Sequence, residues 1–561
     1  MSLSLQSLSK TEAEYSSTRV LTFAMNDRVQ PLDGERDPVK ESNGKNAATT
    51  DAADQPRTPL AIVKNFCNIT TAHGWRRVAN SSHLNVRFIW LALTSCALVI
   101  NILHVTLLVG QYLDFPYEQV AQVELSELPF PSITLCNMQP ISQTTTAAFV
   151  QNETTKVFRW DNITKFFFSS DELGDYDDGG VLSKELLYNR VRQPTGFFEN
   201  IDDESMLIGH QPMDFLLSCT FGLTRCDFDN FTYYQSPDFF NCYTFNGGNT
   251  SRERLIVKST GPSAGLSLIM YLESDNGDFL YNGTYYTFGN ILNAAGVRVV
   301  IHPPDTRPSP QDLGFDIPPG FSSSIGVRAL RHQRLGSPYG SCRPAKDWEL
   351  GGGRYIYSSH SCLKQCQQQH VMDSCACISA ELPIPAEASA RGLNFCGRFN
   401  PDYQQTFYDN LSCEINVTLA FMSSQTTQKQ CGCLPPCEEY EYETKTSYSF
   451  WPLDFTQLQF FDIYVNNHPR ADELKAYKNL GRFNITEIIY RGLIRKNFVR
   501  LNVYLESLVL LEYVEKESYT FSNLWSDIGG TFGLWIGMSI LTWCEVIELI
   551  MGLIFNAFKK K

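Results

Sequence analysis

The sequence lacks the short motifs by which many enzymes are recognised. It has no Walker phosphate loop, no His-Glu-x-x-His zinc motif and no Gly-x-Gly-x-x-Gly dinucleotide motif. It also lacks a basic excess, because 60 acidic residues outnumber 46 basic ones and leave a net charge of -14. These absences argue against an enzyme, against a cofactor and against a nucleic-acid partner.

The first 60 residues contain no apolar run that could act as a signal peptide. They are polar and rich in Asp, Asn, Thr and Pro, a composition that cannot bury enough apolar surface to fold. We therefore expect residues 1–60 to be disordered.

Two long apolar segments follow, each sufficient for the ~20 residues that cross a bilayer. The first span is expected over 87–112, and the second over 519–556. The second exceeds the required length, so part of it should be tilted, broken or outside lipid. Residues 61–87 hold four basic residues and no acid, and the chain closes with three lysines at 559–561. The positive-inside rule then places both termini, 1–86 and 557–561, in the cytosol and 113–518 outside the cell, as in a plasma-membrane protein.

The distribution of cysteines and of glycosylation sequons agrees with this topology. Fourteen of the 17 cysteines lie between the spans, and an even number in an oxidising compartment suggests seven disulfides. Cys67, Cys96 and Cys544 lie in or near the membrane and should be free thiols. The same region carries eight candidate glycosylation sequons: Asn152, Asn162, Asn230, Asn249, Asn282, Asn410, Asn416 and Asn484.

The cysteines are densest between Cys362 and Cys437, where the two ends of the block have mirrored spacing. This pattern suits nested disulfides across a helical hairpin. Clustered cysteines also bind zinc, so a metal site is the alternative interpretation. Spacing alone does not decide the connectivity.

The second span contains residues that a simple membrane helix would avoid. Gly529, Gly533 and Gly537 recur every four residues and share a helix face, which is also typical of closely packed membrane helices. Close packing does not account for Ser539 or for the acids at 545 and 548. A charge at the bilayer centre costs at least ~2.5 kcal/mol unless it faces water or a partner, although Glu548 could instead reach the inner headgroups.

Several motifs in a fixed order identify a family. They are His73-Gly74 before the first span, then FPSITLCN (130–137), CYTFNGG (242–248), GVRVVIH (296–302), DLGFDIPPGF (312–321), SPYGSC (337–342), the cysteine block and SDIGGTFGLWIGMSILTWCEVIE (526–548). The chain resembles a subunit of the degenerin/epithelial sodium channel superfamily from residue 60 onward.

The resemblance implies an α+β membrane protein that assembles as a trimer, here of identical subunits. Each subunit would have two transmembrane helices flanking a large disulfide-rich extracellular domain. The domain would comprise a finger (about 140–240), a β-ball (about 241–300), a thumb (about 342–445), a knuckle (about 467–497) and palm strands between them. Apolar patterns at 265–273, 297–303 and 500–513 independently favour strands.

The resemblance also assigns disulfides and pore residues. The implied pairs are Cys136–Cys242, Cys219–Cys226, Cys342–Cys437, Cys362–Cys433, Cys366–Cys431, Cys375–Cys413 and Cys377–Cys396. The family pattern implies a selectivity belt at Gly537, Met538 and Ser539, where the helix would break into an extended tripeptide and pass sodium. It further implies a gate and pore lined by Ser526, Asp527, Gly530, Gly533, Glu545 and Glu548, an amiloride contact at Gly533, and a gating motif at His73 and Gly74.

The activating stimulus is less directly encoded. Thumb positions that carry acids in proton-gated relatives hold Ile415 and Leu419 here, and Asn502 replaces an expected aspartate. The finger instead interleaves acids and aromatics. This pattern suits either a solvated acidic lobe or a pocket for an amidated Arg-Phe neuropeptide. Overall similarity to the FMRFamide-gated sodium channels of invertebrates favours the pocket, with candidates Phe167, Phe168, Asp171, Phe197, Phe198, Asp202 and Asp203.

Other classes remain as alternatives. A proton-gated, constitutive or mechanosensitive channel of the same superfamily would share every pore feature. A two-span adhesion or scavenger receptor would share the spans and cysteines, but would need neither a helix break nor intramembrane acids. An ATP-gated channel would need clustered lysines for the triphosphate, and the sequence shows none.

Overall fold

The computed structural model describes residues 58–142, 193–200, 205–247, 254–274, 294–345, 354–399, 404–467 and 484–559. Contacts divide the chain into two compact units, one of Thr71–Thr542 and one that combines the chain up to Thr70 with Trp543–Lys561. The larger unit contains the three sheets that the strands of the described ranges form.

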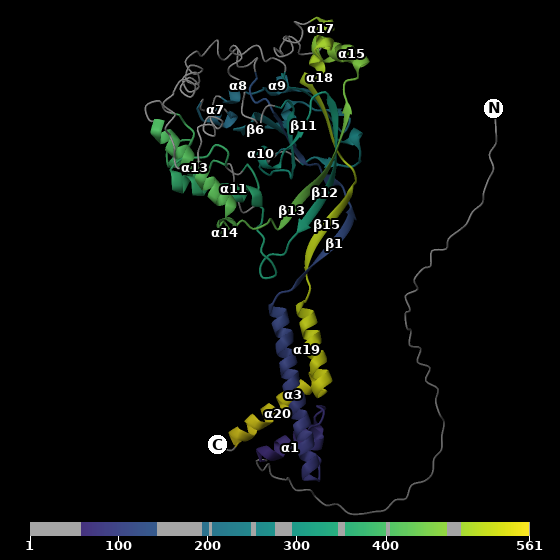
Figure 1. Cartoon of the computed structure of the whole chain (residues 1–561). Helices are drawn as coiled ribbons and strands as arrows, with labels where there is room; N and C mark the ends of the chain where they lie inside the picture. Colours follow the sequence, from purple (N-terminus) through teal and green to yellow (C-terminus); the bar gives the residue numbers. More distant parts are fainter. Residues whose placement is uncertain are drawn as a thin grey trace, which may run out of the picture. The chain divides into compact units, whose positions relative to one another are not determined.

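The larger sheet has the strand order β1-β15-β12-β14-β9-β4-β5, with β13 also paired to β12. Figure 1 labels four of its strands, β13, β12, β15 and β1. Its strands are β1 (Tyr117–Leu125), β4 (Leu216–Phe221), β5 (Thr224–Arg225), β9 (Leu266–Tyr271), β12 (Phe321–Gln333), β13 (Glu438–Phe450), β14 (Phe498–Leu505) and β15 (Val509–Glu517). The predicted strand region 500–513 is therefore two strands, β14 and β15, which are interrupted by a bend at 506–508 and both run parallel to β12.

A smaller sheet follows the order β11-β10-β3-β7-β6. Its strands are β3 (Ser132–Asn137), β6 (Phe231–Ser236), β7 (Phe240–Phe245), β10 (Val297–His302) and β11 (Phe315–Ile317), and β2 (Leu128–Pro129) pairs separately with β8 (Ile256–Val257). The main core lies where residues of both sheets meet, for example Leu135 and Val299 with Leu268 and Val503. Burial of this apolar surface is the main force that holds the sheets together.

Alternate residues of β9 serve two cores. Leu268 and Met270 belong to the main core, whereas Ile269 and Tyr271 pack with a second cluster that includes Phe460. Four short helical segments contribute to this second cluster: α15 (Gln457–Phe461), the π-helical turn η7 (Asp462–Asn466), α17 (Ile485–Tyr490) and α18 (Leu493–Asn497). The strand is buried on both faces, which explains why all of its residues except Ser267 are apolar or aromatic.

Seven disulfides are present, and they are the seven pairs that the resemblance implied. Four of them tie together α11 (Ser359–Cys375), α13 (Gln404–Ser423), α14 (Gln425–Gln430) and the loops around them. Cys67, Cys96 and Cys544 are free thiols, as expected.

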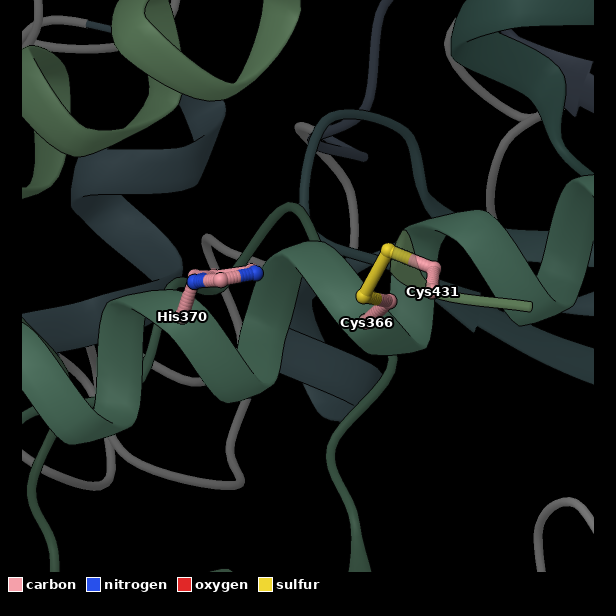
Figure 2. Close-up of side chains that lie close together, drawn as sticks. All are labelled: Cys366, His370 and Cys431. Atoms are coloured by element: carbon pink, nitrogen blue, oxygen red, sulfur yellow. A yellow bond between two sulfur atoms is a disulfide. The ribbon is translucent and has the colours of Figure 1, made fainter. Parts of the chain in front are cut away.

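The zinc alternative can be judged at Cys366, His370 and Cys431, whose ligand atoms lie within 4.8 Å of one another. Figure 2 shows that the two sulfur atoms are bonded to each other. Zinc binds thiolates, and a disulfide offers none. The geometry of this cluster therefore follows from the disulfide, with His370 one turn further along α11.

Helices α2 (Trp75–Asn80) and α3 (Leu84–Leu113) follow the first turn of the larger unit, and α19 (Phe521–Ile536) packs beside α3 (Figure 1). Within the described part of the chain, two helices are long and apolar enough to cross a membrane: α3 and the Ile540–Phe558 part of α20 (Ile540–Lys559). The remaining described helical elements are α1 (Pro59–Ile69), α7 (Pro194–Asn200), α8 (Ser205–Ile208), α9 (Pro212–Phe215), α10 (Pro310–Leu313), α12 (Ala386–Ala390) and the 3-10 turns η3 (Phe228–Asn230), η4 (Pro262–Ala264) and η6 (Asp454–Thr456).

Candidate functional site

The second apolar segment is broken at the predicted tripeptide. Helix α19 ends at Ile536, and α20 begins at Ile540. Gly537 adopts φ 70° and ψ 27°, a left-handed conformation that favours glycine. The tripeptide therefore starts with a left-handed residue, whereas the resemblance implied an extended one.

Ser539 starts the second helix by a reciprocal pair of hydrogen bonds. Its backbone N–H donates to Oγ1 of Thr542 over 3.1 Å, and the N–H of Thr542 donates to Oγ of Ser539 over 3.4 Å. These bonds satisfy donors that a helix start leaves unpaired. In one chain, the side chain of Ser539 thus acts as a helix cap.

The turn that precedes α2 packs directly against this break. The backbone N–H of His73 donates to the carbonyl of Ile536 over 2.9 Å, which pairs an oxygen near the end of α19. The hydroxyls of Thr71 and Thr542 lie 2.7 Å apart, and Thr542 is fully buried. A Cβ atom at Gly537 would collide with the imidazole of His73. Gly537 is therefore required by its backbone conformation and by its neighbour.

Gly74 makes the corresponding contact on the other side of the turn. It has φ +87°, and a Cβ there would collide with Cγ2 of Thr94 in α3. His73 thus contacts the helix break, while Gly74 allows the chain to approach α3. The structure brings together two motifs that are more than 450 residues apart in the sequence.

Glu545 and Glu548 lie one turn apart on α20. The hydroxyl of Thr70 donates to Oε2 of Glu545 over 2.9 Å, within the smaller compact unit. Glu545 is partly buried and Glu548 is exposed. One of the two predicted acids is therefore held by the residue just before the turn.

Helix α19 presents Ser526, Asp527, Gly530 and Gly533 on its exposed surface. A Cβ added at Gly530 or Gly533 would meet no described atom within 4 Å. Packing within the described part of one chain therefore does not explain these glycines. The hydroxyl of Tyr519 donates to Oδ2 of Asp527 over 2.7 Å, so this carboxylate is hydrogen-bonded.

Most of the predicted peptide-pocket residues lie outside the described residues: Phe167, Phe168, Asp171, Asp202, Asp203 and the side chain of Phe197. Phe198 is described, and its placement corrects the prediction. It is 9% exposed and packs in a cluster with Ile208 and Phe240, with an edge-on contact to Phe395 over 5.6 Å between ring centroids. Its ring fills a core and does not line an open pocket.

Helix α7, which carries Phe198, is joined to the loop after Cys396 by one buried amide. Asn200 donates to the carbonyls of Gly196 and Gly397 over 2.7 and 3.2 Å, and its oxygen accepts from the N–H of Phe399 over 2.7 Å. This joint immediately precedes the acidic residues 202–203 in the chain. Sequence reasoning missed it, because a single Asn gives no signal of its partners.

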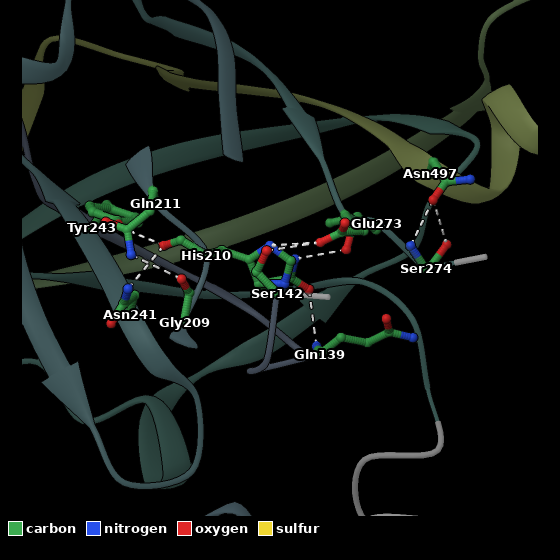
Figure 3. A network of polar contacts seen from close by, with 12 residues as sticks. Gln139, Ser142, Gly209, His210, Gln211, Asn241, Tyr243, Glu273, Ser274 and Asn497 are labelled. Atoms are coloured by element: carbon green, nitrogen blue, oxygen red, sulfur yellow. Dashed lines mark hydrogen bonds and ion pairs between the residues drawn. The ribbon is translucent and has the colours of Figure 1, made fainter. Parts of the chain in front are cut away.

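A buried polar network surrounds His210, which lies between α8 and α9 (Figure 3). Nδ1 of His210 lies 4.0 Å from Oε2 of Glu273, which also accepts from the hydroxyl of Ser142 over 3.0 Å. Tyr243 donates to the backbone carbonyl of His210 over 2.7 Å. Burial lowers the pKa of His210 to about 4, because the imidazolium would lose its hydration, and a contact with the Gln139 backbone opposes this only partly.

Asn502 is buried among serine hydroxyls. Its oxygen accepts from Ser267 over 2.8 Å, and its amide nitrogen lies 3.3 and 3.4 Å from the hydroxyls of Ser322 and Ser324. Neutral partners thus surround a position where an acid was expected. Ile415 and Leu419 lie on α13 and likewise carry no titratable group.

One five-residue segment before β9 resembles a hydrolase motif in its sequence. Residues Gly261–Gly265 read Gly-Pro-Ser-Ala-Gly, which matches the spacing of a nucleophile elbow. They form the 3-10 turn η4 and lead into β9. A nucleophile elbow instead follows a strand and opens a helix, so this segment is a turn between strands.

The model of the amiloride-sensitive sodium channel family matches residues 66–549 of this chain. That range covers the first candidate span, the second one as far as Leu549, the helix break and all fourteen disulfide-bonded cysteines. The chain belongs to the amiloride-sensitive sodium channel family.

Named relatives of this sodium channel family agree with the match. The chain is 32% identical over 90% of its length to the FMRFamide-activated amiloride-sensitive sodium channel of Cornu aspersum and spans 85% of that protein. It is 24% identical over 87% of its length to the epithelial sodium channel subunit alpha of Neoceratodus forsteri, of which it spans 79%. Similarity to degenerin deg-1 of Caenorhabditis elegans is 28% and covers 64% of this chain, but only 41% of that protein. The family consists of ion channels and not enzymes.

Proposed function

We propose that this chain forms a sodium-selective, amiloride-sensitive plasma-membrane channel that an extracellular amidated Arg-Phe peptide opens. The observation that carries the pore assignment is the helix break at Gly537–Ser539, capped by Ser539 and supported by the turn at His73. Freed backbone at membrane depth is tolerated where it lines a water-filled cavity or is buried in protein. In the proposal, Gly537, Met538 and Ser539 replace part of the hydration shell of sodium.

The glycines of α19 support assembly of several identical subunits, with three per channel in the proposal. Gly530 and Gly533 leave open space within the described part of one chain. Glycine on an exposed helix face weakens the helix by ~1 kcal/mol relative to alanine, so a reason outside the single chain is expected. Close approach of neighbouring copies around a pore supplies that reason. Gly533 would also contact amiloride.

The acids and the outer residues complete the proposed ion pathway. Ser526 would form the gate and Asp527 an outer acidic ring, while Glu545 and Glu548 would face the inner vestibule and attract cations. Both termini would be cytosolic. The bond from Thr70 gives Glu545 a second role in the proposal, because it connects the vestibule acid to the chain before the His73 turn.

Peptide gating is proposed from two observations of different kinds. The similar Cornu aspersum protein is named as FMRFamide-activated. In this chain, acids and aromatics alternate through residues 150–214. Carboxylates can pair an arginine side chain bidentately, and aromatic walls can hold a phenylalanine ring. Asp171, Asp202, Asp203, Phe167, Phe168 and Phe197 remain the pocket candidates; Phe198 does not.

Proton gating is the second candidate, and the described residues disfavour it. Asn502 has serine partners and no carboxyl neighbour among its hydrogen bonds, and α13 offers Ile415 and Leu419 where acids would be needed. Constitutive or mechanosensitive opening is kept as a further alternative, because the chain is also similar to degenerin deg-1 and to an epithelial sodium channel subunit.

Recording from cells that express this chain alone tests the proposal. An amidated peptide ending in Arg-Phe should open a sodium current at constant pH, and amiloride should block it. Replacing one pocket carboxylate, as in Asp203→Asn, should raise the half-activating concentration about 10- to 100-fold without altering the reversal potential, since a charge-assisted bond is worth ~1.5–3 kcal/mol. A robust acid-evoked current without any response to such peptides would overturn peptide gating.

A further inference from the structure

A cavity of about 200 Å³ lies beside the helix break. Its walls come from the His73–Gly74 turn, from α2, from α3 and from the end of α19. Three tryptophans line it, namely Trp75, Trp90 and Trp535, together with aliphatic residues such as Ala97. Pockets for drug-sized ligands usually measure ~300–1,000 Å³, so this one is suited to a single hydrocarbon chain.

A guanidinium group lies over the ring of one of the tryptophans that line the cavity. Cζ of Arg77 lies 5.2 Å from the ring centroid of Trp90, and Trp90 also lines the cavity. Among the described residues, no carboxylate lies within ion-pairing distance of Arg77. The segment 61–87, to which Arg77 belongs, contains no acid at all. The site therefore combines an apolar space with a cation that has only an aromatic partner.

We infer that this cavity binds an acyl chain of an anionic phospholipid whose phosphate pairs with Arg77. Arginine binds phosphate bidentately, and the anionic lipids that supply it concentrate in the cytoplasmic leaflet. Tryptophan rings prefer the interfacial region of a bilayer, where one end of the ring is apolar and the other is wet. The choice of leaflet rests on the proposed topology; the pairing of chain and phosphate does not.

The position of the ligand connects it to the pore. Ile536 forms part of the cavity wall, and its carbonyl accepts the hydrogen bond from His73. A bound chain would therefore contact both partners of the bond that supports the helix break. The bound lipid would therefore contact the same residues, His73 and Ile536, that support the proposed selectivity belt.

Fluorescence quenching tests the site without any need for channel activity. The full-length protein is reconstituted in phosphatidylcholine vesicles that contain brominated phosphatidylserine or, in parallel, brominated phosphatidylcholine. The signal from Trp90 is the difference between the wild type and Trp90→Phe. Half-maximal quenching of this signal should need a several-fold lower fraction of brominated phosphatidylserine than of brominated phosphatidylcholine. Soluble glycerophosphoserine, which has the headgroup but no chains, should not relieve the quenching.

Variants separate a specific site from general attraction. Arg77→Gln should abolish the preference for the anionic lipid, while the adjacent, exposed Arg76→Gln should retain it. Ala97→Phe, which fills the cavity, should reduce quenching by both lipids. Equal quenching by the two lipids in the wild type, or equal effects of the two arginine variants, would overturn the inference. So would the absence of quenching by either lipid, which would indicate that a second copy of the chain covers the cavity.

Discussion

Replacing Gly537 with alanine tests the contact on which the candidate pore depends. The variant faces two separate penalties. A left-handed backbone, here φ 70°, costs an L-residue ~1–2 kcal/mol. The new Cβ also overlaps the imidazole of His73, and overpacking typically costs ~1–3 kcal/mol. Together they should destabilise the native channel by about 2–5 kcal/mol.

A double-mutant cycle separates the two penalties. In a His73→Ala background the ring is absent, so Gly537→Ala should cost only the backbone term of ~1–2 kcal/mol. Gly110→Ala is the matched control, because it adds the same methyl group to an apolar helix, α3, where no described atom lies within 4 Å. In a single chain that change should stabilise the helix by up to ~1 kcal/mol.

Thermal inactivation of the full-length channel in nanodiscs, followed by size-exclusion fluorescence, measures the four variants of the cycle. Reversal potentials in mixed sodium and potassium, recorded from cells that express the same variants, report the properties of the selectivity belt. Gly537→Ala should lower the inactivation temperature and reduce sodium preference, and His73→Ala should recover part of the temperature loss. If Gly537→Ala behaves like Gly110→Ala, or if removing the His73 ring changes nothing, the contact has no energetic role.

Further predictions concern three buried polar residues of the larger unit. Asn200→Ala removes three hydrogen bonds and should lower stability by ~2–4 kcal/mol, measured by thermal inactivation, and weaken responses to any ligand bound near α7. His210 has its pKa lowered by burial to about 4, so the unfolded chain binds the proton first as pH falls. Stability should therefore decline from about pH 6.5 towards pH 4, and His210→Gln should reduce this decline. Asn502→Asp places a carboxyl among serine hydroxyls, where burial should raise its pKa; this variant should be less stable at neutral pH and recover on acidification.

Much of the architecture follows from local properties of the sequence. A span requires only apolar length, so α3 could be placed within three residues of its bounds, Leu84–Leu113 against an expected 87–112. Glycine followed by serine favours a helix stop and a helix cap, which is what Gly537 and Ser539 provide. The cysteines were locally visible, but their pairing came from family resemblance, because spacing alone permits many connectivities.

Contacts between distant segments were decided only by the tertiary structure. In the sequence, Phe198 is an aromatic residue close to acids, which suggested a pocket. In the structure it packs against Phe395 in a buried cluster. Nothing in the sequence places His210 beside Glu273, or three serines around Asn502, since these partners come from different strands and loops.

The His73–Gly537 contact separates what the local sequence predicts from what only the tertiary structure decides. Each glycine of the two motifs could be expected to need an unusual backbone, because a left-handed φ is a local property. That the His73 ring would occupy the space of a side chain at Gly537 depends on the folding of α2, α3 and α19 against one another. Local conformation is encoded residue by residue, whereas close approach arises only when the apolar faces of these helices pack together.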